Sequence, residues 1–324
     1  MAKIVTITNP LTGQPAQVDQ LDHTAQQIDD GLNIARGVSN PNLLDNWYFG
    51  NPVNQRGQVT YGHTPVYSID RWSINNDYAF VDINNGHITI RGNDINGYGG
   101  IIQKLEDSVK TALLGKTVTL SVLMKPYTAL ELAGKEVCEG ADSAFGLYSF
   151  TFTGTTNNYV IINAKIPVTP GEPIADIIAV KLELGSQQTL AHQDENGVWV
   201  LNEIPNFGEQ LRRCQRYFVN FNPYRVAWFA MPPAVANNAS QAYSAVSLPV
   251  AMRTQPTVTY GGNIVLSQAS DNTVTGIIVS NSTFTGNSIQ LRYDVGAGGL
   301  TANSLYRVQG HQDSTAYIHL SADL

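Results

Sequence analysis

The chain has 324 residues, of which only 14% are charged, and its 26 acidic and 19 basic side chains give a formal net charge of −7. Its polar residues are mostly uncharged, which is typical of β-rich extracellular or virion proteins. The largest basic group, Arg212, Arg213 and Arg216, is too small for a nucleic-acid-binding face. No apolar run approaches the roughly 20 residues of a membrane span, so we expect neither nucleic-acid binding nor membrane insertion.

Residues 1–41 predict an attachment arm followed by an oligomerising helix. Thr6 to Pro15, with Pro10 and Gly13, has the composition of an extended arm. Beyond it, apolar residues are spaced alternately three and four apart, which is a heptad pattern. These positions are Val18, Leu21, Ala25, Ile28, Leu32 and Ala35. A lone helix of this length is marginal in water, so the stripe needs a partner surface, either other copies in a short bundle or the β part of its own chain.

Residues 42–219 predict a jelly-roll sandwich built from short strands. Asn84, Asn85 and Gly86 separate two alternating segments, and Asn-Gly in that position is the strongest short-range hairpin signal. Other segments alternate at period two, as half-buried strands do. The expected strands include 80–83, 87–90, 118–124, 148–152 and 178–184, with one helical connection at 105–114.

Residues 207–218 predict a short amphipathic helix that packs through Phe207, Leu211 and Cys214. A second β domain, residues 220–324, follows it, and Pro232 with Pro233 predicts an irregular start to that domain. Its expected strands are 258–260, 263–266, 274–279, 289–293, 305–308 and 316–320. The predicted fold class is therefore mainly β: a short coiled-coil-like N-terminal helix, a jelly-roll sandwich and a C-terminal β-sandwich domain.

Motifs for catalysis or metal binding are missing from the sequence. The Gly-Lys-Thr at 115–117 lacks the glycine that a phosphate loop needs five residues earlier, where Lys110 stands. The six histidines have no metal-ligand spacing, and Cys138 and Cys214 are too few and too far apart for a zinc site or a disulfide framework. We therefore expect no enzyme, metal or cofactor; the alternative is a hydrolase whose carboxylates are brought together only by the fold.

Aromatic residues beside amides, carboxylates and arginine predict sugar binding, because a ring covers the apolar face of a pyranose while polar groups bind its hydroxyls. The main candidates are Asp94, Asn96 and Tyr98 in the first β domain and Tyr224, Arg225, Trp228 and Tyr243 in the second, with Tyr61, Tyr67 and Asn93 as further candidates. Trp47, Trp72 and Trp199 lie in or beside strand patterns, so we expect them in the core.

Several stretches resemble fibre-like structural proteins of bacteriophages and prophages. They are KLELGSQQTLAHQ from Lys181, LRRCQRYF from Leu211, NLLDNWYFGNPVNQRG from Asn42, IDRW from Ile69, SLPVAMRTQPTVTY from Ser247 and the final SADL. In such fibres the first of these stretches closes a jelly roll that is similar to carbohydrate-binding modules, and a second β domain follows. The resemblance covers most of the chain from Asn42 onward.

The resemblance implies a virion protein, assembled in the host cytoplasm, that forms a homotrimeric fibre attached to the tail or head. Its partners would be other virion proteins, bound through the N-terminal arm, and bacterial surface polysaccharide. Two alternatives stay open. One is a glycan-degrading or glycan-modifying enzyme with an appended binding module, and the other is a purely structural capsid or collar fibre.

Overall fold

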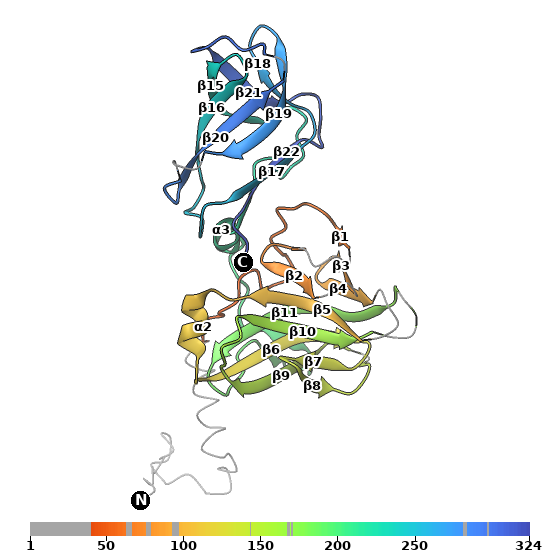
Figure 1. Ribbon diagram of the computed structural model, residues 1–324. Helices are drawn as coiled ribbons and strands as arrows, with labels where there is room; N and C mark the ends of the chain where they lie inside the picture. Colours follow the sequence, from red (N-terminus) through yellow and green to blue (C-terminus); the bar gives the residue numbers. More distant parts are fainter. Residues whose placement is uncertain are drawn as a thin grey trace, which may run out of the picture. The chain divides into compact units, whose positions relative to one another are not determined.

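The computed structural model describes residues 40–62, 67–75, 79–92, 97–142, 144–166, 169, 171–280, 284–296 and 298–324. The residues from Asn42 to Leu324 belong to one compact unit (Figure 1). Several predicted positions lie outside the described residues, and the predictions made for them stay untested. These are Val18, Leu21, Ala25, Ile28, Leu32 and Ala35 of the heptad, and Asn93, Asp94 and Asn96 of the expected sugar site.

The first β part is a sandwich of two antiparallel sheets, which agrees with the expected jelly-roll architecture. One sheet has the order β1-β3-β4-β11-β6-β9 and the other β2-β5-β10-β7-β8. The first sheet contains β1 (Thr60–Tyr61), β3 (Ala79–Ile83), β4 (Ile88–Gly92), β6 (Thr117–Pro126), β9 (Gly146–Thr153) and β11 (Pro173–Leu184). The second contains β2 (Trp72–Asn75), β5 (Tyr98–Lys104), β7 (Leu130–Leu132), β8 (Lys135–Cys138) and β10 (Tyr159–Lys165).

The hairpin of β3 and β4 is confirmed. Ile83 pairs with Ile88 at its end, and Gly86 turns the chain with a φ of 88°. Glycine adopts this left-handed conformation at little cost, whereas a residue with a Cβ is strained there. The Asn-Gly signal therefore predicts both the position and the chemistry of the turn.

The second half of strand β11 is paired along both edges, by β6 on one side and by the chain from Leu43 to Phe49 on the other. The amide of Leu43 donates to the Leu182 carbonyl at 2.9 Å, and that of Phe49 donates to the Ile178 carbonyl at 2.7 Å. Trp47 and Trp72 lie in the apolar core of the sandwich, as expected, and Trp199 is half-buried against it.

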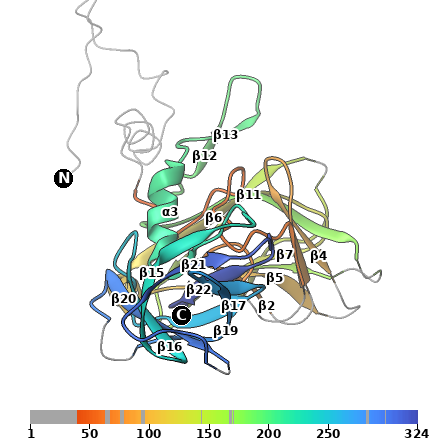
Figure 2. The same ribbon diagram turned by 90° about the horizontal axis from the view of Figure 1, so that it is seen from above.

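Two of the three predicted helices are confirmed, as α2 (Asp107–Leu113) and α3 (Phe207–Gln215). Asn206 caps α3, because its side chain accepts a hydrogen bond from the Glu209 amide at 3.1 Å. The buried positions of α3 are Gln210 and Cys214. The prediction that Phe207 packs is wrong: its side chain is 44% exposed, since it occupies the first turn, beyond the surface that the helix covers. Before α3, β12 (Ala191–Gln193) and β13 (Trp199–Leu201) form a separate hairpin (Figure 2).

The C-terminal part is a closed barrel with a small additional sheet, and not the predicted sandwich. The barrel order is β15-β16-β20-β19-β18-β21, and closure comes from the pairing of β15 with β21. The barrel strands are β15 (Ala230–Asn238), β16 (Gln241–Ser247), β18 (Ile264–Ser267), β19 (Asp271–Val279), β20 (Ser288–Val295) and β21 (Leu305–Gly310). The additional sheet has the order β14-β22-β17, with β14 (Phe218–Asn220), β17 (Thr257–Gly261) and β22 (Tyr317–Ser321). Alternation predicts strands equally well in a sandwich and in a barrel, so it does not distinguish the two.

Pro232 and Pro233 lie inside β15, which corrects the prediction of an irregular start. The register with β21 shifts between Met231 and Ala234, and both prolines are exposed within this bulge. Proline has no N–H to give to a strand ladder, so it is tolerated where the ladder is interrupted. No helix in the described part of the chain has both the length and the apolar character needed to cross a membrane.

Candidate functional site

A cavity of about 590 Å³ lies beside the small β14-β22-β17 sheet. Its walls come from the segment around Arg56 to Tyr67, from the start of the C-terminal part and from the end of the chain. The lining residues are Arg56, Gln58, Tyr61, Gly62, Tyr67, Phe218, Asn220, Asn222, Arg225, Ser314, Thr315, Ala316, Tyr317 and His319. Aromatic, amide and hydroxyl groups dominate this set, and none of the described residues that line the cavity is acidic.

One face of the small sheet forms a wall of the cavity because β22 alternates. Ile318 and Leu320 point into the apolar core of the barrel part and are fully buried. Tyr317 and His319 therefore lie on the opposite face, where Asn220 of β14 pairs with His319. Because side chains alternate along β22, the same pattern that turns Ile318 and Leu320 into the core turns the rings of Tyr317 and His319 towards the cavity.

The rings on this wall touch one another. Tyr317 and His319 are stacked with centroids 4.3 Å apart, and the Phe218 ring meets His319 edge-on at 5.0 Å. Gly261 lies opposite Tyr317 on β17, and a Cβ there would come within 2.7 Å of the Tyr317 ring. Because Gly261 has no side chain, the tyrosine ring can lie flat across the neighbouring strand.

Arg56 closes the other side of the cavity and is held by two buried carboxylates. Its guanidinium reaches Asp70 Oδ1 at 3.2 Å and Asp323 Oδ2 at 2.6 Å, and it lies 4.0 Å from the centroid of the Phe218 ring. Burial raises the pKa of Asp70 to about 6, against the opposing effect of Arg56. The charge of Arg56 is thus compensated by neighbours of its own chain.

His319 is uncharged at neutral pH. Burial lowers its pKa to about 4, and the nearby positive charge of Arg56 acts in the same direction. A neutral imidazole has one donor and one acceptor nitrogen, so His319 can either donate a hydrogen bond to a hydroxyl group or accept one from it.

Arg225 lies at the edge of the cavity in a short loop that Asn222 organises. The Asn222 side chain accepts from the Val226 amide at 2.8 Å and donates to the Ala316 carbonyl at 2.9 Å. Arg225 itself has a φ of 51°, and its Nη2 donates to the Gly57 carbonyl at 3.0 Å. The loop therefore presents an exposed guanidinium in a fixed place.

This combination of groups suits a polar ligand with apolar patches. Ring surfaces can cover C–H groups, while Asn220, His319 and Arg225 can bind hydroxyl or acidic groups. The volume falls within the roughly 300–1,000 Å³ of typical ligand pockets. Saccharides are one ligand class that uses both ring contacts and hydrogen bonds.

Three of the aromatic and basic candidates expected from the sequence line the cavity, namely Tyr61, Tyr67 and Arg225. Other candidates lie elsewhere. Tyr224 is 88% exposed on the same loop as Arg225, and the ring of Trp228 contacts that of His311 at 4.9 Å. Tyr243 lies on β16 opposite Arg292, on the outer face of the barrel.

Sequence reasoning missed Arg56, Asn220, Tyr317 and His319. The available signal was the alternation of Tyr317 and His319 with Ile318 and Leu320, which predicts two ring side chains on the face that does not enter the core. No sequence signal placed Arg56 near them, because it is 267 residues away from its partner Asp323.

Tyr98 belongs to a second surface, on the outward face of the five-stranded sheet. It opens β5, opposite Lys165 of β10. Partial burial raises the pKa of its hydroxyl, and the nearby Glu131 and Glu136 act in the same direction. On the same face the Asn75 side chain donates to Asn163 Oδ1 at 3.0 Å. The surface thus groups amides, carboxylates and one aromatic ring.

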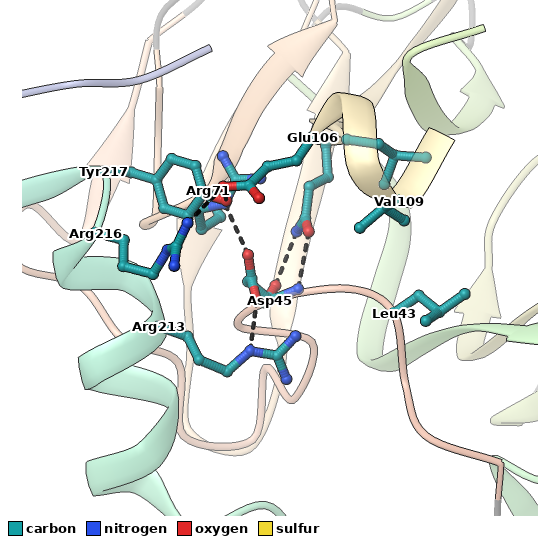
Figure 3. Close-up of a pocket in the computed structure, with 10 residues that line it drawn as sticks. Leu43, Asp45, Arg71, Glu106, Val109, Arg213, Arg216 and Tyr217 are labelled. Atoms are coloured by element: carbon teal, nitrogen blue, oxygen red, sulfur yellow. Dashed lines mark hydrogen bonds and ion pairs between the residues drawn. The ribbon is translucent and has the colours of Figure 1, made fainter. Parts of the chain in front are cut away.

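A smaller cavity of about 250 Å³ lies between α3 and the sandwich and is dominated by ion pairs (Figure 3). Asp45 accepts from Arg71 Nε at 3.0 Å and from Arg213 Nε at 2.6 Å. Glu106 accepts from Arg216 at 3.0 Å and from the Tyr217 hydroxyl at 2.6 Å. These ion pairs link α3 and the residues after it to the sandwich, so the cluster acts as a structural joint.

The described residues contain no group of three or more His, Cys, Asp or Glu side chains that could hold a metal ion. Cys138 and Cys214 are both free thiols. Two carboxylates beside the main cavity, Asp70 and Asp323, are bound to Arg56. A third, Asp313, accepts hydrogen bonds from the amide and hydroxyl of the lining residue Thr315.

No protein-family model and no curated protein matches the chain. Among solved structures, the chain is similar to the N-terminal CBM22-1-CBM22-2 tandem domain of Xyn10C from Paenibacillus barcinonensis. The sequence identity is 8% and the TM-score is 0.28, over 87% of this chain and 96% of that one.

Proposed function

We propose that the protein is a saccharide-binding protein without catalytic turnover, and that it binds through the cavity beside β22. The observation that carries this proposal is the wall formed by Tyr317, His319 and Asn220, opposite Arg56 and next to Arg225. Rings and hydrogen-bonding groups converge there, and none of the described residues that line the cavity is a carboxylate. Such a lining suits sugar binding but does not itself supply the pair of carboxylates that glycoside hydrolysis uses.

We further propose that this activity serves adhesion in a bacteriophage particle, with bacterial surface polysaccharide as the ligand. The stretches from Asn42, Lys181, Leu211 and Ser247 support this setting, because they resemble phage and prophage fibre proteins. The heptad in residues 1–41 supports a homotrimer that is attached to other virion proteins through the N-terminal arm. Three weak sugar sites on one fibre would reinforce one another through effective concentration.

The test is binding of the full-length chain to oligosaccharides on an array and to bacterial cells. We expect Tyr317→Ala to reduce binding at least tenfold, because the variant lacks the aromatic ring that would cover the apolar face of the sugar. A matched control is Phe207→Ala, which removes an exposed ring from the first turn of α3 and not from the residues that line the cavity. Equal loss in both variants, or no loss in Tyr317→Ala, would contradict the proposed site.

A further inference from the structure

We propose that the cavity selects a saccharide that carries a negative charge, and that Arg225 is the residue that recognises this charge. The inference rests on the saccharide binding proposed above and goes beyond it by naming the ligand class. Its ligand would be a sugar bearing a carboxylate, phosphate or sulfate group next to the hydroxyls that the rest of the cavity binds.

The first argument is the charge of the lining. The chain as a whole has a net charge of −7, yet the described residues that line this cavity include Arg56 and Arg225 and no carboxylate. A concave site of one sign concentrates ligands of the opposite sign. The charged side chains that face a ligand in this cavity are therefore basic, which favours an anion.

The second argument separates the two arginines. Asp70 and Asp323 neutralise the charge of Arg56 within the protein. Arg225 has no ion pair with any carboxylate of the described residues, and its recorded side-chain hydrogen bond goes to the neutral carbonyl of Gly57. The uncompensated positive charge at the cavity belongs to Arg225.

The third argument is the backbone at Arg225. Its φ of 51° is in the left-handed region, which is uncommon for a residue other than glycine, asparagine or aspartate. Strained residues of this kind persist when the surroundings fix them, and they are concentrated at binding and active sites. Here Asn222 fixes the turn through the Val226 amide and the Ala316 carbonyl.

The fourth argument is pre-orientation of the guanidinium. The bond from Nη2 to Gly57 uses one of its five N–H groups and holds the planar fork at the cavity edge. The N–H groups that remain suit bidentate binding of a carboxylate or a phosphate, which lysine does not reproduce. Arg225 can therefore distinguish an acidic sugar from its neutral counterpart.

The experiment compares matched pairs of oligosaccharides on one array. Galacturonate oligomers are paired with their methyl esters, and sugar phosphates are paired with the same sugars without phosphate. We expect the wild-type chain to bind acidic members at least tenfold more tightly than their neutral partners, and to lose this preference as salt rises, since charge contacts are screened. The two kinds of pair show whether the acid is a carboxylate or a phosphate.

The variants are Arg225→Gln, Arg225→Lys and the control Arg212→Gln, which removes a charge from the exposed face of α3. Arg225→Gln should bind acidic and neutral members alike, Arg225→Lys should keep part of the preference, and Arg212→Gln should match wild type. Urea unfolding of each variant checks that the fold is intact.

Wild-type binding of neutral members as tight as that of acidic ones would overturn the inference and leave saccharide binding standing. A preference for acidic members that Arg225→Gln retains would also overturn the role of Arg225. No binding to any member by a folded wild-type chain would count against saccharide binding itself.

Discussion

The guanidinium carbon of Arg71 lies 3.6 Å from the centroid of the Tyr217 ring, which joins the sandwich to the chain that leaves α3. Arg71 is buried, donates to Asp45 and to the Lys104 carbonyl, and has a left-handed φ of 71°. A desolvated cation over an aromatic ring contributes about 2 kcal/mol or more. The pair is therefore a principal contact of the structural joint.

We expect Arg71→Met to lower the free energy of unfolding by about 2 kcal/mol or more, since it removes the cation–π contact with Tyr217 while Asp45 stays paired with Arg213. Tyr217→Phe keeps the ring and loses only the hydrogen bond to Glu106, so it should cost about 1 kcal/mol. Urea unfolding followed by tryptophan fluorescence measures both. Arg212→Ala, on the exposed face of the same helix, is the control and should change stability by less than about 0.5 kcal/mol. A similar loss of stability in Arg212→Ala and Arg71→Met would show that Arg71 contributes no more to stability than an exposed arginine.

The second prediction concerns Asp70 and His319, whose titrations affect stability in opposite directions. Burial raises the pKa of Asp70 to about 6, so its contribution to stability is present below its unfolded pKa of 3.8 and is lost as the pH rises through 6. Burial, with Arg56, lowers the pKa of His319 to about 4, so its contribution is present above 6.5 and is lost as the pH falls towards 4. Between these limits the two effects offset each other in the wild type.

Single variants should separate the two slopes. Relative to wild type, the stability of Asp70→Asn should rise with pH between about 4 and 6, by at most about 1.4 kcal/mol per pH unit. The stability of His319→Gln should instead fall with rising pH over the same window. Urea unfolding at several pH values gives each profile, and profiles of both variants parallel to that of the wild type would contradict the prediction.

The strands were largely predictable because apolar and polar residues alternate along them, which indicates the side chains that face the core. In β6, Val118, Leu120, Val122 and Met124 are all fully buried, as their period of two predicts, although the residues between them are buried as well. The short helix α3 was predictable from its apolar spacing. These are local signals, and each is contained within about ten residues of sequence.

The cavity and the barrel closure were not predictable because they depend on contacts between distant segments. Arg56 and Asp323 are 267 residues apart in sequence, and nothing in either segment specifies the other. Likewise β15 and β21 pair across the whole C-terminal part to close the barrel. The alternation of Tyr317 and His319 gives their face but not what lies opposite that face.

The third prediction tests the packing of the five-stranded sheet at Gly100. A Cβ at this position of β5 would lie 1.9 Å from the Ile162 carbonyl oxygen and 2.6 Å from Asn163 Oδ1. Gly100→Ala should therefore force β5 and β10 apart and cost about 1–3 kcal/mol, as overpacking does. The control is Gly140→Ala, since nothing lies within 4 Å of a Cβ there. Thermal unfolding of the two variants makes the comparison, and equal melting temperatures would refute the close contact.

The last prediction is the homotrimer, which rests on the heptad at Val18 to Ala35 and on the resemblance to fibre proteins. Light scattering of the full chain should give a mass of about three times 35.2 kDa. Leu21→Asp combined with Ile28→Asp places charges in the apolar stripe and should shift the mass towards that of a monomer, because buried unpaired carboxylates are costly. Substitution of Gln20 and Gln27 by Asp, outside the stripe, adds the same charge and should leave the mass unchanged.

If saccharide sites act together, the dissociated variant should keep its affinity for a single soluble oligosaccharide but lose most of its retention on bacterial cells. A wild-type chain that is monomeric at micromolar concentration would rule out this assembly.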